Sequence, residues 1–529
     1  LVQGGALRTE WSWSPRAHDR ASIADLAARA TAALRGVIRH CTATGAGGYT
    51  PSDFPLAQLD EDRVAALHRR YPDMEDVWRL APMQHEILLH ARHAPESRAG
   101  QHQLCLALDG AIDASALKRA WRALTARHAA LRVAIADDDL APHQVVRRSL
   151  QLPWHFADWS ALPADARERR LRDFLAQDRT ERFDLAQGAL LRGGLLRSWP
   201  TRHTLVLSFH HILLDGWSIP ILLQELLELY QAARRERSAE LPPARTYRDY
   251  LEWLATIDRK AAEAFWRKRL AGVESLRLDL PDGDSAASPD ALEQHCVALS
   301  ELSTSRLQAA AQARRLTMST MVQGAWALLL TRQAMDRDVV FGMTTAGRPG
   351  DIAGIERMVG LCINTLPRRV RPDPAARVAD WLGDLQARQA EEQTFAWCTL
   401  EDIRGWSAGA ALFDSVVVFE NYPSGASLAG PAVADAPDLT VSAVTSIEQG
   451  VHFPLCLVVG PGSRLTLRLA FGRRRFAAEA IERLADDLVR LLTALAADPD
   501  QSVSALWALA GRQTTDQTRA RVGAEVGAS

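Results

Sequence analysis

Residues 208–218 read Ser-Phe-His-His-Ile-Leu-Leu-Asp-Gly-Trp-Ser and lie between two strongly apolar runs, 205–207 and 219–229. The first run predicts a buried strand, and the second has helical spacing with Pro220 near its first turn. The histidines therefore fall on a strand-to-helix loop, where two rigid elements hold a side chain over a cleft. Because imidazole exchanges protons near neutral pH, we expect chemistry at this loop.

Several groups of this loop suit distinct tasks. His210 and His211 suit acid/base work or polar stabilisation, and Gly216 offers an unobstructed N–H to a substrate oxygen. Asp215 lies one helical step from the histidines and is placed to orient a neighbouring group. Metal ligands and satisfied core histidines fit the same spacing, so the motif by itself leaves those alternatives open.

The pattern His-His-x-x-x-Asp-Gly followed by Trp-Ser resembles the central motif of condensation domains of nonribosomal peptide synthetases. Other segments resemble that family's remaining motifs, in the same order along the chain. They are residues 80–84, with Ala81 where serine is usual, 127–132, 338–349, 358–365, 413–422 and 452–455. A set of motifs in family order across residues 76–505 makes the resemblance specific.

The resemblance implies an α/β fold of two chloramphenicol-acetyltransferase-like lobes. They would form a V-shaped pseudo-dimer with an active-site tunnel at their interface. We expect the lobes at residues 76–280 and 291–505, with the Asp-, Ser- and Ala-rich segment 281–290 as their boundary. The apolar pattern of the second lobe predicts one long helix over 305–330.

Residues 7–40 align without gaps on residues 465–498, and both segments predict a strand, a basic turn and an amphipathic helix. Because the chain starts at Leu1 rather than methionine, we expect a segment of something longer. Residues 1–46 would then be the C-terminal tail of a preceding domain of the same family. Residues 47–75 read as a linker, and 506–529 as a linker or disordered tail.

The glycine- and proline-rich start of that linker resembles the junction that follows epimerization domains. The motif variant at 210–218 and the opening Pro82, Met83 and Gln84 resemble the subtype that takes a D-configured donor. The resemblance thus implies an acyltransferase. It would join a carrier-bound aminoacyl or peptidyl thioester, with a D residue at its activated end, to the amine of a carrier-bound aminoacyl acceptor.

Site roles follow from the resemblance. His211 is the central residue, either a general base for the attacking amine or a positioning group, and His210 is mainly structural. Asp215 is expected to form a structural salt bridge with Arg348, and Gly216 to present its N–H near the thioester. Second-rank substrate contacts are expected from Trp217, Ser218, Asn421 and Tyr422.

Related functions of the same loop require different residues. An epimerization domain usually continues its motif with valine and Ser-Trp-Arg, which residues 217–220 do not match. A heterocyclization domain would have aspartate in place of His210. A non-catalytic platform that recruits carriers or tailoring enzymes, and O-acyl transfer to an alcohol, remain as alternatives.

Composition limits the partners. The net charge of −2 gives no electrostatic reason to expect nucleic acid or a membrane surface. The six cysteines form no C-x-x-C pair, so we expect no metal site, no disulfide framework and a cytoplasmic location. We expect no permanently bound cofactor. The expected partners are an upstream donor carrier and a downstream acceptor carrier, each bringing a 4′-phosphopantetheine arm, and neighbouring epimerization and adenylation domains.

Overall fold

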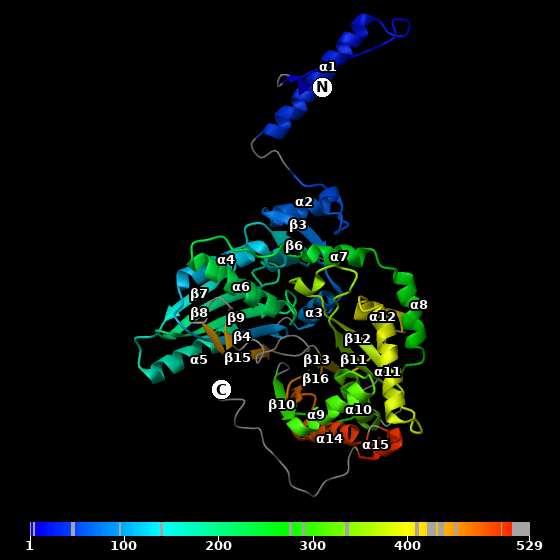
Figure 1. Cartoon of the computed structure of the whole chain (residues 1–529). Coiled ribbons are helices and arrows are strands. Elements are labelled where there is room, and N and C mark those ends of the chain that lie inside the picture. The colour runs from blue at the N-terminus through cyan, green and yellow to red at the C-terminus, as the bar shows by residue number, and fades with distance from the viewer. Residues whose placement is uncertain are drawn as a thin grey trace. The chain divides into compact units, whose positions relative to one another are not determined.

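The computed structural model describes residues 2–3, 6–43, 48–94, 97–137, 141–273, 278–287, 291–333, 338–407, 412–420, 430–431, 439–449, 453–498 and 500–509. The chain divides into two compact units, Leu1–Pro72 and Asp73–Ser529 (Figure 1). The second unit contains every motif named above.

The first unit holds one long helix and short flanking elements. They are β1 (Val2–Gln3), β2 (Ala6–Leu7), α1 (Arg20–Thr42), the 3-10 turn Pro51–Asp53 and α2 (Glu61–Arg70). α1 begins after Asp19, whose carboxylate accepts a hydrogen bond from the N–H of Ser22 at 2.9 Å. The strand expected after residue 7 is wrong, because β2 ends at Leu7, and among the described residues its pairing partner is the two-residue strand β1. A strand is stable only with neighbours that satisfy its backbone.

The second unit contains two large mixed sheets. In the described residues the first has the order β14 (Gly430–Pro431), β15 (Thr440–Gln449), β4 (Gln101–Asp109), β9 (Arg202–His210), β8 (Leu191–Trp199), β7 (Trp154–Asp158). Helices cover it, namely α4 (Ala114–Arg127), α5 (Ala164–Thr180) and α6 (Ser218–Arg234). Consecutive glycines of β8 show opposite faces covered: Gly193 faces Trp121 of α4, and Gly194 faces Phe174 of α5. We call this sheet with its helices the first lobe.

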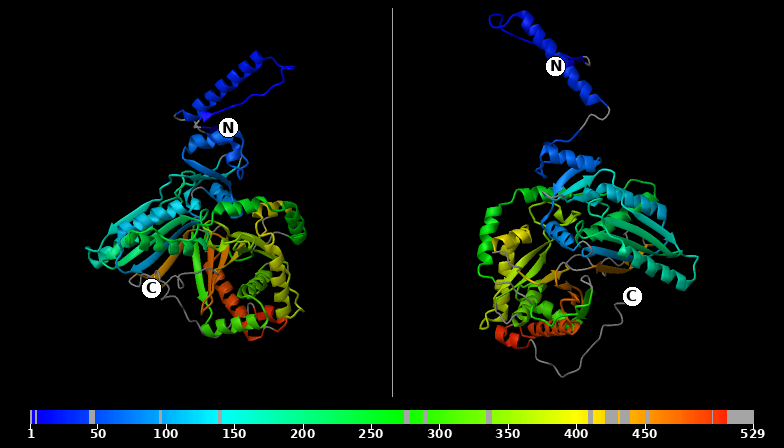
Figure 2. Two further views of the ribbon diagram at one scale, coloured as in Figure 1. Left: turned by 45° about the horizontal axis from the view of Figure 1, so that its top comes forward. Right: turned by 180° about the vertical axis from the view of Figure 1, so that it is seen from behind.

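The second sheet has a separate core. Its order among the described residues is β10 (Leu292–Ala298), β17 (Thr466–Gly472), β16 (Leu455–Gly460), β13 (Ser415–Phe419), β11 (Val339–Thr345), β12 (Asn364–Val370). Alternate residues of β11 enter different clusters. Phe341 packs with the set that includes α9 (Glu301–Ala313), α10 (Met318–Gln333), α11 (Val378–Gln393), α14 (Ala478–Ala497) and α15 (Val503–Leu509). Val340 packs with α8 (Arg259–Arg269) and α12 (Leu400–Trp406). This sheet with its helices is the second lobe (Figure 2).

A small sheet and two helices complete the unit. The strands are β3 (Met74–Arg79), β6 (His143–Arg147) and β5 (Val133–Ala136), and the helices are α3 (Pro82–His93) and α7 (Tyr247–Ala255). α3 lacks a side-chain cap at Ala81. Instead Gln84 Oε1 accepts from the N–H of Ala81 at 2.8 Å, so the helix start is held from within.

The two lobes exchange elements along the chain. β15, from the C-terminal part, pairs with β4 of the first lobe from Thr440↔Asp109 to Gln449↔Gln101. α8, which precedes residue 281, packs in a cluster with β11, β12 and α12 of the second lobe. Neither lobe is therefore a single contiguous stretch of the chain. β15 adds to the edge of the first sheet at β4, and α8 packs on one face of the second sheet.

The helix expected over 305–330 is two helices. α9 ends at Ala313 and α10 begins at Met318, with Arg315 between them in the left-handed region at φ 56°. Thr317 then caps α10, since its hydroxyl accepts from the N–H of Thr320 at 3.0 Å. The single expected helix was wrong because the apolar pattern continues across residues 314–317, where the left-handed Arg315 and the Thr317 cap end one helix and start the next.

The segment 281–290 is anchored where the structure describes it. The N–H of Asp284 donates to the carbonyl of Arg473 at 2.9 Å, and the N–H of Ala477 donates to the carbonyl of Pro281 at 3.0 Å. A side chain at Gly283 would lie 1.8 Å from the Arg473 carbonyl oxygen. This segment therefore lies against the turn between β17 and α14.

The aligned helices α1 and α14 differ in burial. In α14, Ile481 and Leu484 are at most 2% exposed, whereas in α1 the aligned Leu26 is 50% exposed and no described residue of the helix is buried. The same apolar pattern is thus packed on a sheet in one copy and left open within the first unit in the other.

Candidate active site

The sequence motif forms a tight loop between β9, which ends at His210, and α6, which begins at Ser218. Its backbone is held from outside the loop. The N–H of His211 donates to the carbonyl of Gly100 at 2.6 Å, and Gln84 Nε2 donates to the carbonyl of Ile212 at 2.9 Å. The first family motif therefore acts on the central one, because its glutamine side chain fixes the loop.

His211 is oriented through one ring nitrogen. Its Nδ1 lies 2.7 Å from the carbonyl oxygen of Leu214. A carbonyl oxygen only accepts hydrogen bonds, so Nδ1 carries the hydrogen, and the neutral ring has its lone pair on Nε2. The side chain is partly exposed. His211 is thus arranged to accept a proton or a hydrogen bond at Nε2.

His210 has a different environment. It is 7% exposed, and its Nδ1 accepts from the N–H of Ile212 at 3.2 Å. Burial, with a smaller contribution from the neighbouring His211, lowers the pKa of His210 to about 3. His210 is therefore neutral near pH 7, and its hydrogen bond supports the turn.

The carboxylate of Asp215 is saturated by contacts that join the two lobes. Arg348 Nη2 lies 3.0 Å from Oδ1 and 3.1 Å from Oδ2, and both side chains are buried. Oδ2 also accepts from the N–H of Cys362 at 3.1 Å, and Oδ1 from the N–H of Ser218 at 2.9 Å. Burial opposes the charge of Arg348, yet Asp215 outweighs it, and the pKa of Arg348 lies above its usual value. The structure thus joins the two residues for which the resemblance implied a salt bridge.

Arg348 is presented by a turn that requires glycine. Gly347 has φ 59°, and a Cβ there would lie 1.7 Å from the carbonyl oxygen of Cys362. Arg348 Nη1 also donates to the carbonyls of Ile355 at 2.6 Å and Met358 at 2.9 Å. Hydrogen bonds within the second lobe therefore fix the Arg348 guanidinium independently of its contact with Asp215.

The residues after Asp215 fall into two groups. Gly216 and Trp217 are partly exposed, whereas Ser218 is fully buried. The Ser218 hydroxyl lies 2.8 Å from Asp215 Oδ1 and 2.9 Å from the carbonyl of Gly360, and it accepts from the N–H of Gly360 at 3.1 Å. This corrects the expectation that Ser218 contacts substrate, because its hydroxyl is used between the lobes. Asn421 and Tyr422 lie outside the described residues.

Sequence reasoning missed two contacts with the loop. One is the hydrogen bond from Gln84, which the first motif indicated only as part of a match. The other is His102 of β4, whose ring meets that of His211 with centroids 4.8 Å apart. Only the pairing of β4 with β9 reveals it, and no motif marks His102.

The second family motif has a structural place. Glu225 of α6 accepts from Arg127 Nε at 2.8 Å and lies 2.6 Å from His128 Nε2. Burial raises the pKa of Glu225, but the bonds from His128 and Arg127 outweigh it and the pKa is lowered. The second family motif thus joins α4 to α6, the helix that begins at the end of the motif loop.

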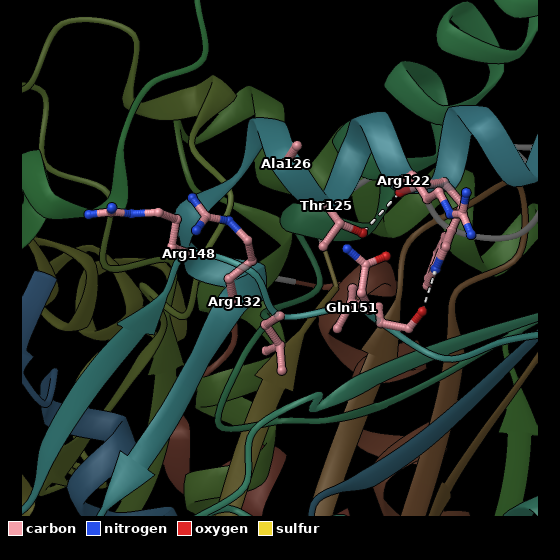
Figure 3. Close-up of a pocket in the computed structure, with 9 residues that line it drawn as sticks. Arg122, Thr125, Ala126, Arg132, Arg148 and Gln151 are labelled. Atoms are coloured by element: carbon pink, nitrogen blue, oxygen red, sulfur yellow. Dashed lines mark hydrogen bonds between the residues drawn. The ribbon is translucent and has the colours of Figure 1, made fainter. Parts of the chain in front are cut away.

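A separate cavity lies at the end of α4 (Figure 3). It has a volume of about 70 Å³, and its lining is Trp121, Arg122, Thr125, Ala126, Arg132, Arg148, Leu150, Gln151 and Leu152. No residue of the motif loop lines it. Figure 3 shows Arg132 and Arg148 at one end and Arg122 at the other, so the guanidinium groups do not converge on one point.

The described residues meet neither the requirements of a metal site nor those of a membrane-spanning helix. Those residues contain no group of three or more His, Cys, Asp or Glu side chains placed to hold a metal ion. None of their helices combines the length and apolar character needed for a membrane span.

Comparisons with known proteins agree with this geometry. A family model described as Condensation domain matches residues 74–518. The chain therefore belongs to the condensation domain family of nonribosomal peptide synthetases, whose members are amide-bond-forming acyltransferases.

Curated relatives are much longer proteins. One of the subunits of linear gramicidin synthase from Brevibacillus parabrevis is 37% identical over 508 residues, which cover 95% of this chain and 6% of the relative. Another subunit of the same synthase is 38% identical over 514 residues, covering 96% of this chain and 10% of the relative. This chain thus spans a tenth or less of their length, and both alignments extend into the residues that precede position 74.

Solved structures share the fold. The first condensation domain of the calcium-dependent antibiotic synthetase matches with a TM-score of 0.66 at 21% identity, covering 80% of this chain and 97% of that one. The X-domain from teicoplanin biosynthesis matches with a TM-score of 0.68 at 23% identity, covering 80% and 96%. The fold is therefore the two-lobed, chloramphenicol-acetyltransferase-like α/β fold.

Breaking the ion pair between the lobes should destabilise the second unit. We predict that Asp215→Ala and Arg348→Ala each lower the free energy of unfolding by about 3–5 kcal/mol, since each leaves a buried charge without its partner. Urea unfolding measures this. In the double variant Asp215→Ala/Arg348→Ala the two losses should be far from additive, and simple additivity would contradict a direct coupling.

The burial of His210 should appear in the pH dependence of stability. Its folded-state pKa of about 3 lies below that of an unfolded histidine, so only the unfolded chain gains a proton below about pH 6.5. The free energy of unfolding should therefore fall as pH drops from about 6.5 toward 3, by up to about 1.4 kcal/mol per unit for this group.

His203, whose pKa burial lowers to about 4, adds to the same trend. His210→Gln keeps an acceptor for the N–H of Ile212 and removes the titration, so urea midpoints between pH 7 and 5 should change less. His155→Gln, at an exposed position, is the matched control. An unchanged slope in His210→Gln would refute the assignment.

Proposed function

We propose that this domain forms a peptide bond between two carrier-bound substrates in nonribosomal peptide synthesis. The donor is an aminoacyl or peptidyl thioester, and the acceptor is the amine of an aminoacyl thioester. The observation that carries the proposal is the 2.7 Å hydrogen bond between His211 Nδ1 and the Leu214 carbonyl, which makes Nε2 of this partly exposed ring the atom that would face a substrate. Membership of the condensation domain family supports the reaction type.

Positioning supplies most of the rate in this scheme. The amine nitrogen attacks the thioester carbonyl carbon, the C–S bond breaks, and the proton released by the amine goes to the departing thiolate. An α-amine titrates near 8, so about a tenth of it is already unprotonated and nucleophilic at pH 7. Holding amine and carbonyl in near-attack geometry is worth roughly 7–11 kcal/mol.

His211 is placed to serve this step at Nε2. It holds the amine by accepting a hydrogen bond, and it carries the amine proton as positive charge develops. Gly216, two residues after the Leu214 carbonyl, presents its N–H near the thioester oxygen. The His211 imidazole and the Gly216 N–H both belong to the loop that the ion pair of Asp215 and Arg348 holds. His210 stays neutral and has a structural role.

The substrates reach this loop on flexible arms. We propose that upstream donor and downstream acceptor carriers insert 4′-phosphopantetheine arms through a tunnel between the lobes, which then needs no permanently bound cofactor. Trp217 is the candidate contact at the loop, since it is partly exposed. Asn421 and Tyr422 remain candidates on the sequence pattern.

Loss of the imidazole should slow product formation strongly while leaving the fold intact. With two loaded carriers, His211→Ala should lower the rate of dipeptide formation by about 10²–10⁴-fold, measured by mass spectrometry. His211→Asn, which keeps a group able to bond the Leu214 carbonyl, is the matched variant, and thermal unfolding checks the fold. No product from the wild type with bound carriers would favour a recruiting platform, and product only with an alcohol acceptor would favour O-acyl transfer.

We further propose that the domain takes a donor with a D-configured terminal residue and follows an epimerization or condensation domain. The resemblance of residues 210–218 and 82–84 to that subtype supports the D-configured donor, and the resemblance of residues 47–55 to the junction after epimerization domains supports the preceding domain. The similarity to gramicidin synthase subunits also extends before residue 74. Residues 1–46 would be the tail of that preceding domain, since the apolar side of α1 matches the buried side of α14. Adenylation domains are further expected neighbours.

Donor stereochemistry has a direct test. With D- and L-aminoacyl donors on the same carrier and one acceptor, the D donor should give the faster single turnover by at least about tenfold, as expected where a pocket is shaped for one configuration. A chain that starts at residue 48 should keep this preference, because the proposed tail belongs to another domain. Equal rates, or faster reaction of the L donor, would refute the proposal.

A further inference from the structure

A histidine outside every motif packs directly on the proposed catalytic imidazole. His102 lies near the start of β4, and its register partner on β9 is Phe209. Its ring stacks on Phe209 with centroids 5.2 Å apart and planes 8° apart. The same ring meets His211 with centroids 4.8 Å apart and planes at 71°. Both are geometries that aromatic pairs favour.

The contact with His102 restricts a rotation of the His211 ring that its hydrogen bond to Leu214 still allows. The bond from Nδ1 to the Leu214 carbonyl fixes the direction of one ring atom. It still lets the ring rock about the line between the two atoms, and rocking moves Nε2 on the far side of the ring. A flat ring held edge to face against the imidazole removes that motion.

His102 is itself held by the sheet. β4 is a central strand, with β9 on one side and β15 on the other, and its partner on β15 is Glu448. The N–H of His211 also bonds to the carbonyl of Gly100, two residues before His102. Gly100, the residue before β4, therefore fixes the backbone of His211, and His102, near the start of β4, packs against its ring.

We propose that His102 is a positioning residue that sets the plane of the His211 imidazole and hence the aim of Nε2. This inference rests on the proposed function of His211. It assigns His102 no proton transfer and no contact with substrate. The ring contact is the feature that matters, so another flat aromatic side chain stacked on Phe209 should replace it.

The test compares three variants with two loaded carriers. His102→Ala should lower kcat by on the order of ten- to a hundredfold, because a misplacement of about 1 Å near the reacting atoms costs that much. The KM for the acceptor carrier should stay unchanged. His102→Phe should restore kcat to near the wild-type value with an unchanged pH profile. His155→Ala, which removes an exposed histidine stacked on Phe174 at 4.9 Å in the same lobe, should leave kcat unchanged.

The outcomes separate this inference from the proposed function. If the wild type makes peptide and His211→Ala does not, the function holds. Wild-type kcat in His102→Ala would then overturn the role of His102. A His102→Phe variant as slow as His102→Ala, with normal thermal unfolding, would also overturn it, since the ring contact would not be what matters.

Discussion

The buried ion pair between Asp215 and Arg348 is the constraint on which the site depends. Asp215 belongs to the loop of the first lobe, and Arg348 belongs to a glycine turn of the second. A buried carboxylate is tolerated only when its oxygens are satisfied, and here the partners come from Arg348, Cys362 and Ser218. The Asp215 end of the loop is thus held by groups of both lobes, so the shape of the loop depends on the contact between the lobes.

Within this frame the two adjacent histidines are made different by their surroundings. His210 is buried in the sheet, and the cost of charging it there keeps it neutral. His211, one residue later, leaves the strand and gives one nitrogen to the Leu214 carbonyl. The Gly100 carbonyl bonds the backbone N–H of His211, His102 packs against the His211 ring, and Gln84 of α3 bonds the carbonyl of the next residue, Ile212. His210 thus stabilises the turn of the loop, whereas the loop orients the ring of His211.

The sequence allowed prediction of most strands and helices near the site, because the apolar runs beside residues 208–218 leave few alternatives. The break at Arg315 was missed, since a left-handed residue interrupts an apolar pattern without changing it. The place of β15 in the first lobe and of α8 in the second was also missed, because such contacts depend on which surfaces remain uncovered. His102 shows the same limit: its partner on β9 is set by strand register, which a single sequence does not fix.

The comparison of α1 with α14 shows why pattern alone cannot assign a partner. Both helices carry apolar residues at the same spacing, yet α14 buries them on β10 and β17 while no described residue of α1 is buried. An amphipathic helix gains most of its stability from the surface that covers its apolar side. If residues 1–46 are the tail of a preceding domain, as we propose, the open side of α1 would be covered by a surface of the kind that α14 has. A preceding domain of the same fold would supply one, whereas a second copy of this chain already has that surface covered by its own α14.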